Sequence, residues 1–206
     1  KNGSYGKLMK AYYAKQDAEK LSGKGDTSQK LTLMKTSADS LKKSADALND
    51  SSLWGKKKIK KKDEKTGEEI EVEDYDWDKI TKAVKSFVED YNDVVKEAGE
   101  SNTKDVLRNA SWMTGMTDKN SNMLAKIGIT IGKGNKLELD EDALKQADIS
   151  SLKTVFTGYN SFVSKISQKA TGISNAANRA SATYTNNGTY SKTDSSLTSS
   201  KIDKEV

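Results

Sequence analysis

The chain has 206 residues, of which 33% are apolar and 32% are charged, with a formal net charge of +5 and no Cys, Pro or His. The missing Cys and His exclude disulfides, thiolate and imidazole nucleophiles, and the common zinc sites. No stretch reaches the roughly 20 apolar residues of a membrane span. The low apolar fraction disfavours a thick, rounded core and favours a slender helical architecture.

The N-terminal quarter predicts two helices. Residues 1–25 predict a short one with a Tyr-rich patch, and residues 27–50 predict a longer one with Thr27 or Asp26 as its N-cap. The apolar residues of the longer helix follow the 3, 4 spacing of a coiled-coil seam. They are Leu31, Met34, Ala38, Leu41, Ala45 and Leu48. A stripe this narrow needs a partner helix.

Residues 51–76 interrupt the helical period. A basic run at 56–62 and an acidic run at 68–74 flank a possible turn at Thr66-Gly67, and Ile70 and Val72 alternate with acids as in a strand. This pattern predicts a small charged β-hairpin, with a disordered charged loop as the alternative. If the two runs pair, their opposite charges face each other and the local electrostatic field largely cancels. The basic run therefore does not indicate nucleic-acid binding.

Residues 77–99 return to the helical period, and Gly99 is a plausible stop. The seam residues of this segment are Trp77, Ile80, Val84, Phe87, Tyr91, Val94 and Ala98. Val88 and Val95 widen the stripe, so this helix is expected to contact two neighbours. Residues 104–126 predict one or two short helices with a break at 118–122.

Residues 127–139 alternate as a second hairpin around a turn at 132–135, and three acids then open a helix. The glycines of this hairpin do not match a phosphate-binding P-loop, because the G-x-x-x-x-G-K-[ST] spacing is absent. Asp140, Glu141 and Asp142 do not match a calcium loop, because Leu144 and Lys145 occupy positions that the EF-hand pattern gives to other residues.

Residues 151–184 predict the last long helix. Its seam is rich in alanine and consists of Val163, Ile166, Ala170, Ile173, Ala177 and Ala180, extended by Tyr184. Small seam residues let two helices approach closely, so this helix is expected to pair with the helix at 27–50. Residues 185–206 are rich in Ser, Thr, Asn and Gly and predict a flexible or partner-ordered tail.

Two longer segments carry a specific motif. Residues 124–130 have the sequence LAKIGIT and residues 136–144 have the sequence KLELDEDAL. Together they resemble the "L-A-x-I-G-I-T … G-x-L-x-L-D-E-x-x-L" signature of the flagellar hook-associated protein 2 family, the flagellar filament cap. Residues 87–95 (FVEDYNDVV) resemble the family's "F-V-x-x-Y-N-x-L-V" helix, and residues 155–158 (VFTG) resemble the segment before its last helix. The resemblance covers roughly residues 77–184.

The resemblance implies a structural protein of the bacterial flagellum, exported to the outside of the cell and assembling as a small ring or plug. It implies no catalysis and no cofactor. The expected partners are further copies of the chain, flagellin or other hook-junction proteins, with no nucleic acid and no membrane insertion. The family's rod packs an N-terminal helix against C-terminal ones. The family also carries large β-rich heads between its helical halves, whereas only residues 51–76 fill that place here.

The expected fold is mainly α, an elongated helical bundle or coiled-coil rod with one or two small β-hairpins. Residues 1–50 and 77–184 would form a discontinuous rod domain, 51–76 a charged insert and 185–206 a tail. The residues proposed for seam packing are Leu31, Met34, Leu41, Leu48, Ile80, Val84, Phe87, Tyr91, Val94, Val163, Ile166 and Ile173. Those of the family-motif hairpin are Ile127, Gly128, Ile129, Thr130, Leu137, Leu139, Asp140 and Glu141.

Two alternatives stay open at this point. The seams could pack within one chain, between copies, or both. The three tryptophans, Trp54, Trp77 and Trp112, could belong to the core or line a sugar-binding platform. An extracellular adhesin-like module that binds through Trp54 and Trp77 is therefore the second functional hypothesis.

Overall fold

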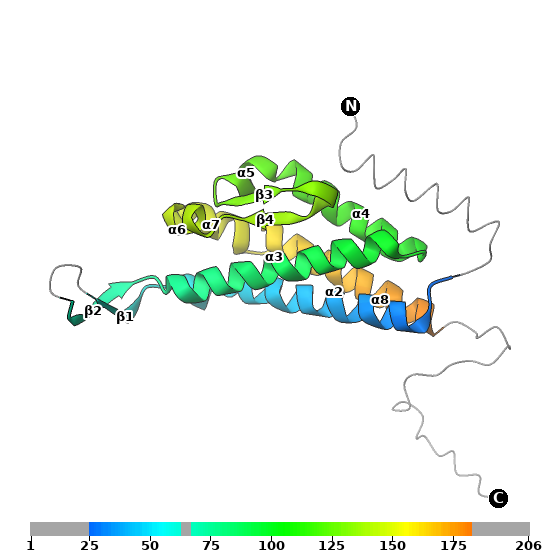
Figure 1. The fold of residues 1–206 in the computed structure, drawn as a ribbon, viewed down its shortest axis with the longest axis horizontal. Helices are drawn as coiled ribbons and strands as arrows, with labels where there is room; N and C mark the ends of the chain where they lie inside the picture. Colours follow the sequence, from blue (N-terminus) through cyan, green and yellow to red (C-terminus); the bar gives the residue numbers. More distant parts are fainter. Residues whose placement is uncertain (1–24, 63–66, 183–206) are drawn as a thin grey trace, which may run out of the picture.

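A computed structural model of the chain describes residues 25–62 and 67–182. The Tyr-rich helix predicted at 1–25 and the tail predicted at 185–206 fall on residues outside these ranges. Over the described residues the fold is mainly α and elongated, with two small antiparallel hairpins (Figure 1). The fold class expected from the sequence is therefore confirmed.

Three long helices form the rod: α2 (Ser28–Asn49), α3 (Trp77–Glu100) and α8 (Phe162–Ser181). Each begins at a residue whose side chain accepts a hydrogen bond from a backbone N–H of the first turn, which satisfies a donor that the helix itself leaves unpaired. These N-caps are Thr27, Asp76 and Ser161. At ~1.5 Å per residue the three helices are rods of roughly 30–36 Å.

Helices α2 and α8 lie side by side and antiparallel (Figure 1). Serines of α8 mark their register, because Ser167 Oγ donates to Asp46 of α2 and Ser174 Oγ donates to Asp39 one heptad earlier in α2. The seam between the two helices contains buried alanines from both, namely Ala38, Ala45, Ala170 and Ala177. The pairing inferred from the small seam residues is thus what the structure contains.

A second layer covers one side of the rod (Figure 1). It consists of α4 (Lys104–Lys119), α5 (Ser121–Ala125), β3 (Ile129–Ile131), β4 (Leu137–Leu139), α6 (Glu141–Gln146) and α7 (Ile149–Phe156). The predicted break after α4 is present, and Asn120 separates the two short helices. A 3₁₀ turn, η2 (Lys133–Asn135), connects the paired strands β3 and β4.

The prediction of one last helix over 151–184 is wrong in its first part. The chain forms α7 up to Phe156 and starts α8 only at Phe162. Thr157 has an extended backbone (φ −118°, ψ 147°), and Ser161 then caps the new helix. The apolar spacing continues across this break because residues on both sides face the same core, so the spacing alone does not reveal the change of direction.

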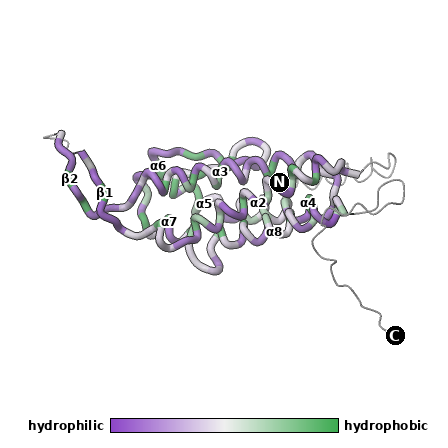
Figure 2. Tube along the Cα trace, turned by 90° about the horizontal axis from the view of Figure 1, so that it is seen from below, coloured by the Kyte–Doolittle hydropathy of each residue, from purple (hydrophilic) through white to green (hydrophobic). Residues whose placement is uncertain are grey.

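The charged hairpin consists of β1 (Lys57–Lys62) and β2 (Glu69–Asp74). It projects from one end of the rod, beyond the start of α3 (Figure 1), and its colouring in Figure 2 is mostly hydrophilic. Its register places Lys58 opposite Glu73 and Lys60 opposite Glu71. The predicted pairing of the basic run with the acidic run is therefore present.

An aromatic cluster closes the core at the hairpin end of the rod. The ring of Trp54, in the 3₁₀ turn η1 (Ser51–Trp54), stacks on Phe156 with ring centroids 5.4 Å apart, and Trp54 Nε1 donates to the carbonyl oxygen of Leu48 at 2.8 Å. Phe87 packs edge-on against both Phe156 and Phe162. The cluster joins η1, α3, α7 and α8 into one core.

Candidate functional site

All twelve residues proposed for seam packing are buried inside a single chain. They come from α2, α3 and α8, and each is at most 4% exposed. Their burial means that a neighbouring subunit could reach them only if the rod opened. Surfaces for assembly must then be sought on the outside of the fold.

A polar row runs along the outside of the α2–α8 seam. Lys35 and Ser174 both bond to the carboxylate of Asp39, and Lys42 and Ser167 repeat the arrangement at Asp46. Burial raises the pKa of both carboxyls, but the hydrogen bonds from lysine and serine outweigh it, so the pKa of each lies below its ordinary value. Because the two sets lie seven residues apart on antiparallel helices, both match at the same time in only one register.

The family-motif hairpin depends on a glycine with a positive φ. Gly128 has φ 79°, and a Cβ at this position would lie 2.6 Å from the carbonyl oxygen of Asp140 and 2.9 Å from the amide nitrogen of Leu144. The Gly128 carbonyl accepts from the Asp140 amide at 2.8 Å, which closes the hairpin. The isoleucine–glycine–isoleucine sequence thus lets the strand pass directly against the start of α6.

The remaining motif residues divide between core and surface. Ile127, Ile129 and Leu137 are buried and Leu139 is half-buried. Thr130, Asp140 and Glu141 are exposed. Asp140 is the N-cap of α6 and accepts from the amides of Asp142 and Ala143, while Glu141 forms an ion pair with Lys85 of α3. The acids therefore have structural contacts of their own.

Asn92 joins the motif hairpin to the rod. Its side-chain amide donates to the Leu137 carbonyl at 2.9 Å, and its side-chain oxygen accepts from the Leu137 amide at 2.7 Å. The neighbouring Tyr91 is fully buried and donates its hydroxyl to Thr117 of α4 at 2.9 Å. Sequence reasoning placed Tyr91 in a seam but assigned no role to Asn92, although both stand in the segment that resembles the family's Y-N motif.

Asp26 makes a contact that the sequence did not indicate. Its carboxylate accepts hydrogen bonds from the hydroxyls of Ser101 and Thr103 and from the amides of Asn102 and Thr103. Burial raises the pKa of this carboxyl, but these bonds outweigh burial and hold it below the ordinary value. Asp26 thus links the connection between α3 and α4 to the start of α2. The sequence predicts Asp26 only as an alternative to Thr27 for the N-cap of this helix.

A shallow groove between α2 and α3 contains a carboxyl whose pKa is raised, that of Asp90. The groove has a volume of about 400 Å³ and is lined by lysines, serines and alanines of both helices, with Asp90 among them. Burial is the main cause of the raised pKa of Asp90. A hydrogen bond with the Ser44 side chain lowers the pKa and offsets part of this effect.

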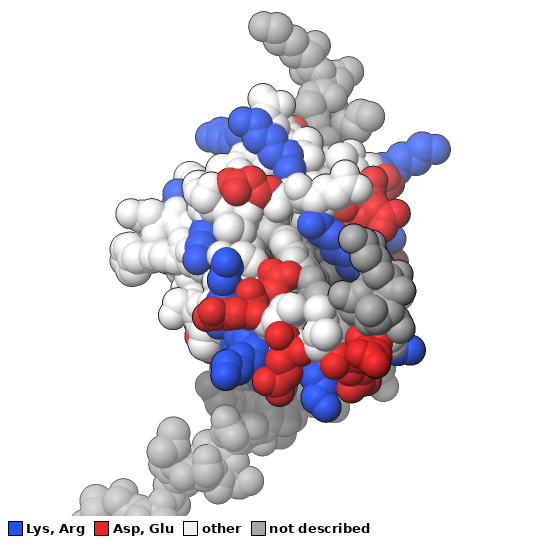
Figure 3. Space-filling model, turned by 90° about the vertical axis from the view of Figure 1, so that its left-hand side faces the viewer, with Lys and Arg blue, Asp and Glu red and all other residues white. Residues whose placement is uncertain are grey.

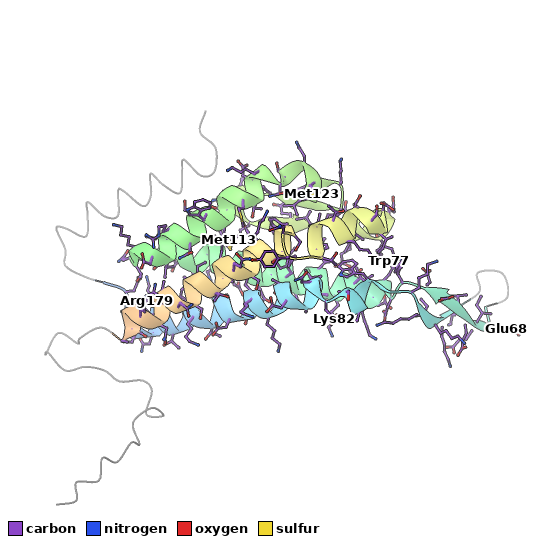
Figure 4. All side chains as sticks on the ribbon, turned by 180° about the vertical axis from the view of Figure 1, so that it is seen from behind. Glu68, Trp77, Lys82, Met113, Met123 and Arg179 are labelled. Carbon is purple, nitrogen blue, oxygen red and sulfur yellow. The ribbon has the colours of Figure 1, made fainter. Side chains whose placement is uncertain are left out.

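The three tryptophans have different environments. Trp54 is buried in the aromatic cluster, and Trp77 is half-buried at the base of the charged hairpin (Figure 4). Trp112 on α4 is 58% exposed, and Lys169 of α8 lies 5.1 Å from the centre of its ring. Beside it, Gly115 and Met116 line a second shallow surface hollow. The structure does not bring the three rings together.

Neither a metal site nor a membrane span is found in the part of the chain that the structure describes. No group of three or more carboxylates there could hold a metal ion. None of the helices in residues 25–62 and 67–182 is both long enough and apolar enough to cross a bilayer.

The fold is an elongated helical bundle, and the family-motif hairpin is hydrogen-bonded to its rod through Asn92. A family model described as flagellar hook-associated protein 2 C-terminus matches residues 101–205. The chain belongs to this family, which is a structural family of the bacterial flagellum. Comparison with curated proteins and with solved structures gives no match.

Proposed function

We propose that the chain is a cap-like, hook-associated-like assembly component of the flagellum that acts outside the cell by contacting neighbouring subunits. The observation that carries the proposal is the match of the flagellar hook-associated protein 2 C-terminus model to residues 101–205. Within the fold, two hydrogen bonds between Asn92 and Leu137 attach the family-motif hairpin to the rod. A rod whose seams are filled from within presents a constant outer surface, as a subunit in a stacked assembly requires.

The exposed stripe of α4 is the surface we assign to contact with flagellin or another hook-junction protein. Trp112 is largely exposed, and Met116 lies one turn further along the same helix face beside Gly115. An exposed aromatic ring next to a flexible apolar side chain and a small residue is the composition of an interface hot spot. The Lys169 ammonium lies over the Trp112 ring, so the ring also has a cation–π contact in this patch.

Light scattering and crosslinking of the chain, alone and mixed with flagellin or hook-junction proteins, test the proposal. We expect binding to one of these partners, and we expect Trp112→Ala to weaken it at least tenfold, since hot-spot aromatic residues contribute about 2 kcal/mol or more. Tyr159→Ala is the matched control, because Tyr159 is also an exposed aromatic residue, at 83% exposure, but lies outside the stripe. A chain that stays monomeric and binds neither partner would contradict the proposal.

The adhesin-like alternative remains a prediction without a supporting observation. It uses the rings of Trp54 and Trp77 on one surface, and the ring of Trp54 is only 1% exposed. A glycan or host-protein ligand would have to bind at Trp77 without it.

A further inference from the structure

The two strands of the charged hairpin have opposite charge. Every charged residue of β1 is a lysine and every charged residue of β2 is an acid. Lys58, Lys60 and Lys62 lie on one face of the ribbon opposite Glu73, Glu71 and Glu69, and Lys60 forms an ion pair with Glu69 at 3.6 Å. Opposite charges across an antiparallel pair stabilise it, so the hairpin is electrostatically matched within itself.

The outer edges of the ribbon keep the same separation of charge. The sheet has two strands in the described residues, so one outer edge is basic β1 and the other is acidic β2. The ribbon extends away from the rod, with Glu68 near its outer end and Trp77 at its base (Figure 4). Both edges are therefore accessible to another strand along their length, and the rod covers neither of them.

The other face of the ribbon carries three apolar residues, next to the charged pair Lys57 and Asp74 at its base. Ile59 lies opposite Val72, with Ile70 on the same face, and Ile70 is 40% exposed. A two-stranded ribbon is only marginally stable by itself, whereas three or more strands with a common apolar face are stable. Further strands added at the edges would give these apolar side chains additional neighbours.

We propose that the hairpin is a self-assembly element in which the basic β1 edge of one copy pairs with the acidic β2 edge of the next copy. Pairing of like edges would place lysine against lysine or glutamate against glutamate, and like charges directly opposite each other are destabilising. Because β1 and β2 run antiparallel, hairpins repeated in the same orientation bring β1 beside an antiparallel β2 of the neighbour. A head-to-tail contact of this kind closes into a ring when the rotation between copies permits it.

The end-on view shows why the edge, and not the end surface of the rod, is the place for this contact. In Figure 3 basic and acidic side chains are interspersed over the hairpin end of the molecule, with no continuous patch of either sign. Separation of charge by strand is confined to the ribbon, where the register fixes it. The inference rests on the proposed assembly role and names a further copy of the chain as the partner.

Cysteine crosslinking of the full chain tests the arrangement, because the natural sequence has no Cys. Ile59→Cys places a thiol on β1 and Val72→Cys places one on β2, and neither changes a charge. With a short thiol-specific crosslinker, we expect the mixture of the two variants to give dimers at least five times faster than either variant alone. Equal rates in all three samples, or no crosslinking, would overturn the inference.

A charge-swapped hairpin supplies the matched control. The changes Lys58→Glu, Lys60→Glu and Lys62→Glu, together with Glu69→Lys, Glu71→Lys and Glu73→Lys, preserve the pairing within the hairpin and reverse the sign of the charge on each strand. A swapped chain should crosslink to another swapped chain and fail to crosslink to an unswapped one. Crosslinking that ignores the swap, or that is lost in both mixtures, would overturn the inference. Retained binding to flagellin or a hook-junction protein in that case would leave the proposed function standing.

Discussion

Single polar side chains hold the layers of this protein together at the residue scale. Asn92 is the clearest case, because its amide satisfies both backbone groups of Leu137 as a neighbouring strand would. Gly128 is the second, because it permits a contact between two backbone segments that any side chain would block. Both stand in family-motif segments, and both roles are structural.

Replacing Asn92 by alanine should destabilise the fold by about 2–3 kcal/mol, because the N–H and C=O of Leu137 both lose their partner in a half-buried site. Urea unfolding followed by circular dichroism measures the change. Asp93→Ala is the control, since Asp93 is the next residue on α3 and is exposed. Equal stability of the two variants would show that the clamp contributes nothing.

Gly128→Ala should cost about 3 kcal/mol or more, because it combines a strained positive φ with a contact of 2.6 Å to the Asp140 carbonyl oxygen. Gly134→Ala separates the two causes, since Gly134 also has a positive φ, 71°, but has open space around its Cβ position. We expect that variant to lose only about 1 kcal/mol. Thermal or urea unfolding of both chains measures the difference, and similar losses would mean that the close contact is unimportant.

At the scale of elements, the α2–α8 pair combines close packing with a polar row that sets its register. The buried alanines allow the approach, and the two Lys–Asp–Ser sets seven residues apart favour one alignment of the antiparallel helices.

Ala170→Leu should destabilise the protein by about 1–3 kcal/mol, because three additional carbon atoms must fit between α8 and its neighbours. Gln168→Leu adds a leucine to the exposed side of the same helix and should change stability by less than about 0.5 kcal/mol. Comparison of the two unfolding midpoints is the measurement. An unchanged midpoint in Ala170→Leu would mean that the seam is loosely packed.

For the whole molecule, the dependence of stability on acidic pH comes from carboxylates, since there is no histidine to titrate between pH 5 and 8. The pKa values of Asp26, Asp39 and Asp46 are lowered in the folded state. The folded chain therefore binds fewer protons than the unfolded one, so this contribution is complete above the ordinary pKa of about 3.9 and is lost as the pH falls below it.

The free energy of unfolding from urea titrations should accordingly be similar at pH 7 and 5 and lower at pH 3, by about 1–3 kcal/mol after allowance for solvent screening. Asp90 acts in the opposite direction, because its raised pKa favours the protonated folded state, and it offsets part of the loss. Asp26→Asn should flatten the dependence. A chain more stable at pH 3 than at pH 5 would contradict this account.

The helical seams could be predicted from the sequence because each depends on a local period of apolar residues, as in the spacing of Leu41 and Leu48. The charged hairpin could be predicted because its two runs differ in sign. The contacts of Asp26 and Asn92 could not, since they join segments 75 and 45 residues apart and leave no periodic trace. The break between α7 and α8 could not be predicted for a related reason. Phe156 and Phe162 both pack against Phe87 in one core, although the chain changes direction between them.

Because α2 and α8 are antiparallel, the beginning of α2 and the end of α8 lie at the same pole of the molecule, opposite the charged hairpin (Figure 1). A tensile load applied through these two ends would peel the helices apart one contact at a time, beginning near Leu31 and Ala177. A load applied between the hairpin and either end would instead shear many contacts at once. The direction of pulling should therefore decide the mechanical strength of the subunit.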